Sequence, residues 1–101
     1  MFVHIVFWKL LDTGANGKSR EQNARELKRL FHNMRGKIPG LQRIDFEADL
    51  LRTPESADVA LYTEFDSRQA YDGYVVHPLH QEIVAFFPGN RTERRVVDYE
   101  I

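Results

Sequence analysis

The chain of 101 residues contains no cysteine, carries almost no net charge and has no apolar run long enough to cross a bilayer. Without cysteine there is no disulfide framework, no thiolate nucleophile and no cysteine-based metal or iron–sulfur site. With 14 Lys and Arg against 15 Asp and Glu residues, the net charge of −1 gives no positive field of the kind that nucleic acid or anionic lipid requires. We therefore expect neither nucleic acid nor a membrane as a partner.

The beginning of the chain also lacks the features of a secretory signal. A strand-like run starts at Phe2, with no basic segment before it and no small-residue cleavage site after it, so a cytoplasmic location is expected. The length suits a single domain over residues 1–101, and a chain this short buries only about two-thirds of its unfolded surface. Oligomerisation is the expected source of further stability, because no disulfide contributes.

Hydrophobic periodicity predicts four strands and three helices. The strands are expected over Phe2–Leu11, Leu41–Leu51, Asp58–Phe65 and Thr92–Ile101, and the helices from a Ser19 cap to about Arg35, from an Asp66 or Ser67 cap to Val76, and over Leu79–Phe87. Ser19 and Gln22 fit a capping box, and His77 should mark a break because Pro78 disfavours helical backbone before it. The order β-α-β-β-α-α-β indicates an α+β fold of ferredoxin-like type, an antiparallel four-stranded sheet with all helices on one face.

Residues of both parities in the first strand are apolar, which predicts that both faces of this strand are covered. The helices cover one face of the sheet, so we expect a second copy of the chain to cover the other. Two sheets packed face to face in a symmetric dimer would form a barrel.

The densest group of titratable and aromatic side chains lies at the corner between the last two helices, from Tyr71 to His80. A corner lets Tyr74 and His80 converge on one volume, and a histidine beside a tyrosine hydroxyl suits enolisation of a carbonyl compound. His4 stands in an otherwise apolar central strand, where it needs a polar partner. A structural role is the alternative for each: core packing for His4 and the tyrosines, solvent exposure for His80 and helix capping for His77.

Other kinds of site have weaker support. Zinc could use His4, His77 and His80, but no H-x-x-x-H pair shares a helix face and no carboxylate has a matching spacing, so no metal is predicted. The segment from Arg91 to Arg95 holds three arginines and Glu93, and we interpret it as a solvated strand end or a salt-bridged rim rather than an anion site. No phosphate-binding loop, nucleophile elbow or dinucleotide motif occurs.

Five segments, in their order along the chain, resemble the stress-responsive A/B barrel (Dabb) family. They are VHIVFWKL (3–10), IPGL (38–41), DVALYTEFDS (58–67), YVVHPLH (74–80) and RVVDYE (95–100). The resemblance covers essentially the whole chain. It implies a ferredoxin-like monomer that packs sheet against sheet in a dimeric α/β barrel.

The same resemblance implies roles for three residues. Some family members are stress-associated oligomers, and a plant polyketide cyclase of this fold closes a ring by an aldol-type reaction without a cofactor. Its working residues match Tyr74, His80 and His4, which implies His80 as general base, Tyr74 as support for the enolate and His4 as an orienting or pocket-lining group. No cofactor is implied. Where the family often has glycine, Ala48 would tighten the local backbone or fill part of the cavity.

For these three residues to meet, His4 must point toward the helices. The predicted pocket lining is then Val6, Trp8, Tyr71 and Phe87, and the predicted dimer interface is Val3, Ile5 and Phe7, on the other face of the first strand. The leading hypothesis is a homodimer with a small apolar pocket for an apolar or carbonyl-containing ligand, with cofactor-independent proton transfer or cyclase-like aldol chemistry as its activity.

Two alternatives differ in class from this hypothesis. One is a noncatalytic stress or assembly protein whose histidines are structural. The other is a cofactor-independent monooxygenase, because antibiotic-biosynthesis monooxygenases share the dimeric barrel. A cavity of about 300 Å³ or more with His80 and Tyr74 at its wall would favour ligand binding, and a filled interior would favour assembly.

Overall fold

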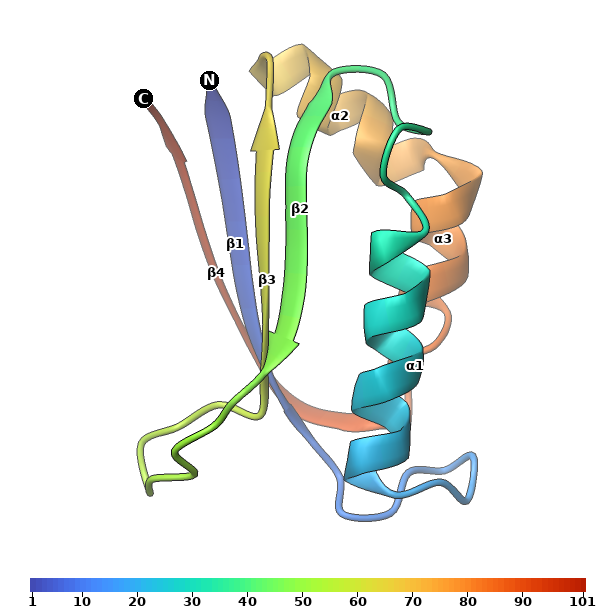
Figure 1. Ribbon diagram of the computed structural model, residues 1–101. Coiled ribbons are helices and arrows are strands. Elements are labelled where there is room, and N and C mark those ends of the chain that lie inside the picture. Colours follow the sequence, from blue (N-terminus) through green and yellow to red (C-terminus); the bar gives the residue numbers. More distant parts are fainter.

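The computed structural model describes all 101 residues as a four-stranded sheet with three helices packed on one face (Figure 1). The elements are β1 (Phe2–Leu10), α1 (Arg20–His32), β2 (Leu41–Ala48), β3 (Val59–Phe65), α2 (Arg68–Val76), α3 (Pro78–Val84) and β4 (Arg91–Glu100). The strands lie in the order β2-β3-β1-β4, and every neighbouring pair is antiparallel. The predicted ferredoxin-like α+β fold is therefore confirmed. None of the helices has the length and apolarity needed to cross a membrane.

Local signals set the helix boundaries near the corner and at the start of α1. Ser19 caps α1 through the predicted capping box with Gln22. His77 ends α2 and caps α3: its backbone is extended, with φ −66° and ψ 139°, as the following Pro78 requires. The Nδ1 atom of His77 accepts a hydrogen bond from the Leu79 N–H at 3.1 Å, which is the capping role predicted for it. The two helices consequently meet at a corner.

The strand β2 is shorter than predicted, because a turn replaces its expected end. β2 stops at Ala48, and the next carboxylate, Asp49, accepts a hydrogen bond from the Arg52 N–H at 2.7 Å. Arg52 has a φ of 54°, in the left-handed region that strand backbone does not adopt. Leu50 and Leu51 are therefore carried into the loop, where they are 90% and 83% exposed.

Two helices also end earlier than predicted. α1 ends at His32 rather than Arg35, because the following N–H groups bond to carbonyls three residues back and Gly36 then turns with a φ of 74°. α3 ends at Val84, but Phe87 stays buried because the tight turn after the helix remains packed on the core. Hydrophobic periodicity thus predicted which residues are buried more accurately than it predicted where the helices end.

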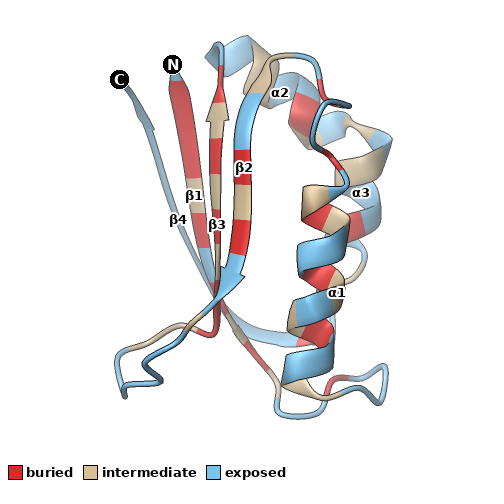
Figure 2. Ribbon diagram, viewed as in Figure 1, coloured by how far each residue is buried: buried red, intermediate tan, exposed pale blue.

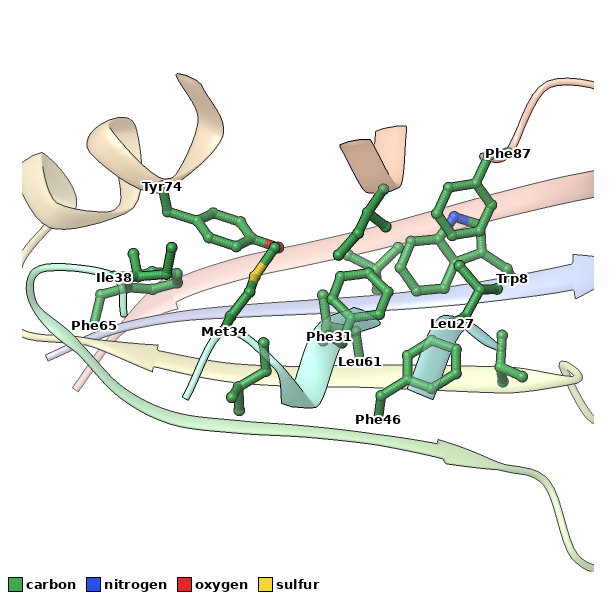
Figure 3. Packing of buried hydrophobic residues seen from close by; sticks show 14 of the residues in the cluster. Trp8, Leu27, Phe31, Met34, Ile38, Phe46, Leu61, Phe65, Tyr74 and Phe87 are labelled. Atoms are coloured by element: carbon green, nitrogen blue, oxygen red, sulfur yellow. The ribbon is translucent and has the colours of Figure 1, made fainter. Parts of the chain in front are cut away.

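The hydrophobic core fills the space between the helices and one face of the sheet (Figure 2). Even-numbered residues of β1 face this core, with exposed fractions of 6% or less for Phe2, His4, Val6, Trp8 and Leu10. Trp8 is stacked on Phe87, with ring centroids 4.7 Å apart, and lies 6.0 Å from Phe31 (Figure 3). Every residue of β4 is exposed, so one side of the interior is bordered by a strand that the helices do not cover.

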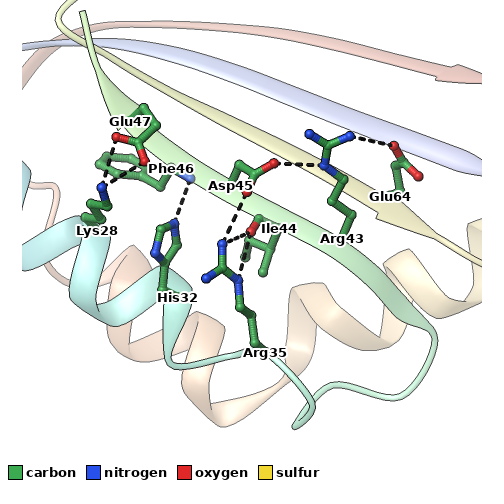
Figure 4. Close-up of polar contacts among 9 residues, drawn as sticks. All are labelled: Lys28, His32, Arg35, Arg43, Ile44, Asp45, Phe46, Glu47 and Glu64. Carbon is green, nitrogen blue, oxygen red and sulfur yellow. Dashed lines mark hydrogen bonds and ion pairs between the residues drawn. The ribbon is translucent and has the colours of Figure 1, made fainter.

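Side chains of α1 and the turn after it close the free edge of β2 (Figure 4). The His32 Nε2 atom accepts a hydrogen bond from the Phe46 N–H at 3.1 Å, and the Arg35 guanidinium donates to the Ile44 carbonyl at 2.9 Å. Backbone groups on this edge are thereby occupied and do not offer a template for another strand. Association through the edge of β2 is disfavoured, so the remaining unpartnered surfaces of the sheet are the edge of β4 and the open face.

The open face of the sheet carries an apolar patch on β1 and β4, bordered by Arg95 and by the Lys9–Glu93 ion pair. Phe7, Val97 and Tyr99 are 41%, 51% and 39% exposed, and Ile5 is half-buried between Tyr62 and Val97. Val3 is fully covered within the chain itself, with no exposed surface, so of the residues predicted for the dimer interface only Ile5 and Phe7 present surface to a partner.

Candidate functional site

A cavity of about 300 Å³ lies between the α2–α3 corner, β1 and the beginning of β4. Its polar wall includes His4, Tyr74 and His80, and its apolar wall consists of Val6, Trp8, Phe31, Leu61, Ile83, Val84, Phe87 and Pro88. The structure thus brings the three motif residues to one volume. Ala48 lies outside the lining, at the exposed end of β2, and does not fill the cavity.

Tyr71 differs from the other predicted pocket residues, because it does not line the cavity. Its ring lies 4.8 Å from the His4 ring and 4.9 Å from the Phe2 ring, measured between centroids. It packs against His4 without joining the lining of this cavity. Helical spacing did not show which neighbours the Tyr71 ring would pack against, and a ligand-binding role for Tyr71 stays a prediction.

His80 has one ring nitrogen engaged and the other free for chemistry. Its Nδ1 atom lies 2.9 Å from the Val75 carbonyl oxygen, which accepts but cannot donate, so Nδ1 carries the hydrogen. The neutral ring then presents the Nε2 lone pair. Burial lowers the pKa of His80, despite the opposing effect of the Val75 carbonyl, so this lone pair is available at neutral pH. The arrangement is that of a general base.

Tyr74 reaches from α2 into the interior and is only 1% exposed (Figure 3). Its hydroxyl has no hydrogen-bond partner within the protein, although the group is buried. The ring centroid lies 4.3 Å from that of His80 and 6.4 Å from that of His4. Burial raises the pKa of Tyr74 well above its ordinary value, so the hydroxyl stays protonated and acts as a donor. A buried, unsatisfied donor is costly, typically about 1–3 kcal/mol, unless something in the cavity accepts its hydrogen bond.

His4 has a partner that the sequence did not reveal. Its Nδ1 atom lies 2.5 Å from an Asp98 carboxylate oxygen, on the neighbouring strand β4. Burial lowers the pKa of His4, and this effect exceeds the opposite effect of the Asp98 carboxylate. Asp98 and Glu100 both lie on the helix-facing side of β4. The strand register decides which of them is the partner of His4, because it places Asp98 directly opposite His4. The carboxylate holds the imidazole in one orientation and directs its other nitrogen away from β4.

No group of three or more His, Asp or Glu side chains is arranged to hold a metal ion. His77, which could have joined His4 and His80 as a ligand, uses its Nδ1 atom as a helix cap and does not line the cavity. The predicted motif therefore contributes two imidazoles and one phenol to a cavity that also has an apolar wall and two arginines, Arg91 and Arg94. Such a set can move a proton and stabilise an oxyanion.

The two cavity histidines make the folded state sensitive to acid. Their pKa in an unfolded chain is about 6.5, whereas burial lowers the pKa of His4 and His80 in the folded protein. Below about pH 6.5 the unfolded chain therefore binds more protons than the folded protein does. The free energy of unfolding is consequently highest above this pH, as far as these two histidines are concerned, and it decreases as the pH falls below it. We expect a lower melting temperature at about pH 5 than at about pH 7.5, and a smaller difference in a His80→Gln variant. Calorimetry at both pH values checks this, and equal differences for the two proteins would contradict it.

Comparison with known protein families agrees with this architecture. The family model named Stress Responsive A/B Barrel Domain matches residues 2–101. No protein of curated function matches the chain. A dimeric protein of unknown function with a ferredoxin-like fold, from Bacteroides fragilis, is 26% identical with a TM-score of 0.80, and the match covers 99% of this chain and 95% of that one.

Two further solved structures share the fold. A dimeric ferredoxin-like protein of unknown function from Thermobifida fusca is 21% identical with a TM-score of 0.84, over 99% of this chain and 90% of that one. A hydroxynitrile lyase from Passiflora edulis is 18% identical with a TM-score of 0.77, over 99% of this chain and 92% of that one. With the family match spanning nearly its whole length, the chain belongs to the stress-responsive A/B barrel (Dabb) family.

Proposed function

We propose that this Dabb protein is a homodimer whose cavity binds a small carbonyl compound and moves a proton next to the carbonyl group without a cofactor. The observation that carries the proposal is a cavity whose wall holds both Tyr74 and His80, with their rings 4.3 Å apart and one nitrogen of His80 free. The Tyr74 hydroxyl is buried in the cavity wall without a partner, and a carbonyl or enolate oxygen that reaches it would accept the hydrogen bond that the protein leaves unmade. The cavity volume of about 300 Å³ is at the lower end of the range for small-molecule sites.

The chemistry follows from the protonation states of the two groups. The Nε2 atom of neutral His80 removes a proton from the carbon between two carbonyl groups, and the C–H electron pair becomes the enolate. Tyr74 donates its hydrogen bond to the enolate oxygen as negative charge develops there. When the enolate carbon attacks a second carbonyl of the same molecule, a C–C bond forms. The resulting alkoxide takes its proton from the His80 imidazolium, which restores the neutral base and completes an aldol closure.

His4 supports this reaction by position. Asp98 fixes its ring, and the adjacent Tyr71 packs against it, so the imidazole wall of the cavity has a single orientation. A neutral His4 facing Tyr74 helps to orient the carbonyl group without competing for the same proton as His80.

The dimer would form through the open face of the sheet. Phe7, Val97 and Tyr99 expose apolar surface there, and α1 occupies the edge of β2, so a face-to-face arrangement covers this apolar surface. The opposite half of this face, on β2, carries Arg43, Asp45 and Glu47. We therefore propose that the dimer contact centres on the apolar residues Phe7, Val97 and Tyr99 of β1 and β4. Two similar structures are described as dimeric.

Proton transfer can be tested before a physiological substrate is known. We expect the protein to accelerate exchange of deuterium from D₂O into the central carbon of β-diketones such as 2,4-nonanedione, measured by NMR. The acceleration should depend on protein concentration and fall at low pH, because His80 must be neutral to accept the proton. Buffer of the same imidazole concentration is the control. No acceleration across a series of diketone chain lengths would favour the noncatalytic alternative.

A further inference from the structure

Two arginines stand at the cavity where the sequence predicted only a solvated or salt-bridged strand end. Arg94 lies opposite Trp8 in the β1–β4 register, and Arg91 lies opposite Leu10, beyond a bulge between Lys9 and Leu10. Residues three apart on a regular strand face opposite sides of a sheet. The bulge adds one residue and so brings both arginines to the face that borders the cavity, where both contribute to the lining.

The charges of these two arginines are not balanced by neighbouring carboxylates. Glu93, which could have paired with them, lies on the other face of β4 and forms an ion pair with Lys9 at 3.8 Å, so the predicted salt-bridged rim does not form. Asp98 shares their face, but its carboxylate bonds to His4 at 2.5 Å and forms no ion pair with either arginine. The guanidinium groups of Arg91 and Arg94 take part in no ion pair or hydrogen bond of the structure; Arg94 accepts one only through its backbone carbonyl, from Arg95.

The other polar groups of the cavity leave this positive charge uncompensated. His4 and His80 are neutral at pH 7 and Tyr74 keeps its proton, so no anion faces the two guanidinium groups from within the cavity. The charge of Arg94 reaches the site itself, since it lowers the pKa of both histidines. The cavity thus combines an apolar interior with unpaired guanidinium groups at one end. This combination suits an amphipathic anion, a ligand with an apolar body and a negatively charged end.

We propose that Arg91 and Arg94 form a carboxylate-binding subsite, so that the ligand of the cavity has an apolar body and a carboxylate end. The apolar part would lie against Trp8 and Phe87, and the carboxylate would accept hydrogen bonds from the guanidinium groups on β4. This inference rests on the proposed ligand-binding cavity and narrows its substrates to carbonyl compounds that also carry an acid group. Fixing the acid at β4 would leave the remainder of the molecule to reach Tyr74 and His80.

Trp8 allows the subsite to be tested directly, because it is the only tryptophan and lines the cavity. Its fluorescence is followed during titration with octanoate and with octanamide, which have the same chain and differ in charge. We expect octanoate to bind about tenfold more tightly at low salt, because hydrogen bonds to charged groups are the stronger kind. The preference should shrink as salt is added.

The variants separate this subsite from general charge effects. An Arg91→Gln, Arg94→Gln double variant should bind both probes equally, whereas Arg95→Gln should keep the preference, since Arg95 lies opposite Phe7 on the other face of β4. All three side chains are exposed, so the variants should fold. Equal affinity in the unmodified protein, or an unchanged preference in the double variant, would overturn the subsite while leaving the cavity proposal intact. Failure of both probes to bind would overturn both, and a retained preference without deuterium exchange would contradict only the proposed chemistry.

Discussion

Replacing His80 with alanine should slow catalysed α-proton exchange by about 100-fold or more, because general-base catalysis contributes about 10²–10⁴ in rate. The neutral Nε2 atom of His80 is the proton acceptor in the proposed reaction, and no other titratable side chain of α3 lines the cavity to replace it. Initial exchange rates of the variant and the unmodified protein, measured with the same diketone, provide the check. A variant that retains more than a tenth of the rate would exclude His80 as the base.

The matched control is His77→Asn, three residues away. His77 lies outside the cavity and caps α3 through its side chain, a role that asparagine also fills. This variant should therefore exchange protons at the rate of the unmodified protein. A similar loss in both variants would point to damage at the corner rather than to loss of the base.

The Tyr74→Phe variant provides a second, independent test of catalysis at this site. Removing one donor to a developing oxyanion costs about 10²–10³ in rate where such a donor acts. The ring remains, and the unsatisfied buried hydroxyl disappears, so thermal stability should stay the same or rise. A slower and equally stable variant separates catalysis from folding. If Tyr74 serves only the core, exchange should be unaffected.

Replacing Phe7 with aspartate should convert the dimer to a monomer, with a dissociation constant raised by about 100-fold or more. A buried, unpaired carboxylate costs several kcal/mol, and each factor of ten in affinity corresponds to about 1.4 kcal/mol. Phe7 is 41% exposed within one chain, so the substitution places the new charge on the open face rather than in the core. Light scattering over a range of concentrations measures the change in mass.

The control for the dimer is Val76→Asp. Val76 is 71% exposed at the end of α2, on the helix side of the sheet and away from the proposed contact. This variant should remain dimeric. If Phe7→Asp also stays dimeric at the lowest concentration measured, the dimer does not use the β1–β4 half of the open face. If the unmodified protein is monomeric, the shared barrel is wrong for this chain.

Most of the fold could be predicted because its signals are local. The capping box at Ser19 and Gln22 needs four residues, and the break at His77 needs only the proline after it. Where the local pattern was continued too far, the structure shows why: the predicted strand to Leu51 contains an apolar position at Leu50, but Arg52 adopts a left-handed turn and directs that position into solvent. Alternation records which residues are apolar, and it does not record where a turn interrupts them.

In the candidate site, too, some contacts follow from the local sequence and others arise only from the tertiary structure. Tyr74 and His80 lie six residues apart on either side of one corner, so local structure alone brings their rings to 4.3 Å. The partner of His4 lies 94 residues away along the chain, and the pairing of β1 with β4 selects it. Tyr71 has the same helical spacing as a pocket residue, but three-dimensional packing puts it against His4 and outside the cavity lining.

The sequence by itself determined the order of elements, the corner that joins Tyr74 to His80 and the apolar character of both faces of β1. Only the tertiary structure decided that Asp98 holds His4 and that Arg91 and Arg94 share the cavity side of β4. The physical reason is that side chains alternate along a strand, so one bulge or a register shift of one residue exchanges the two faces. Bulges and register shifts depend on how the strands of the whole sheet pair, so the local sequence does not predict them.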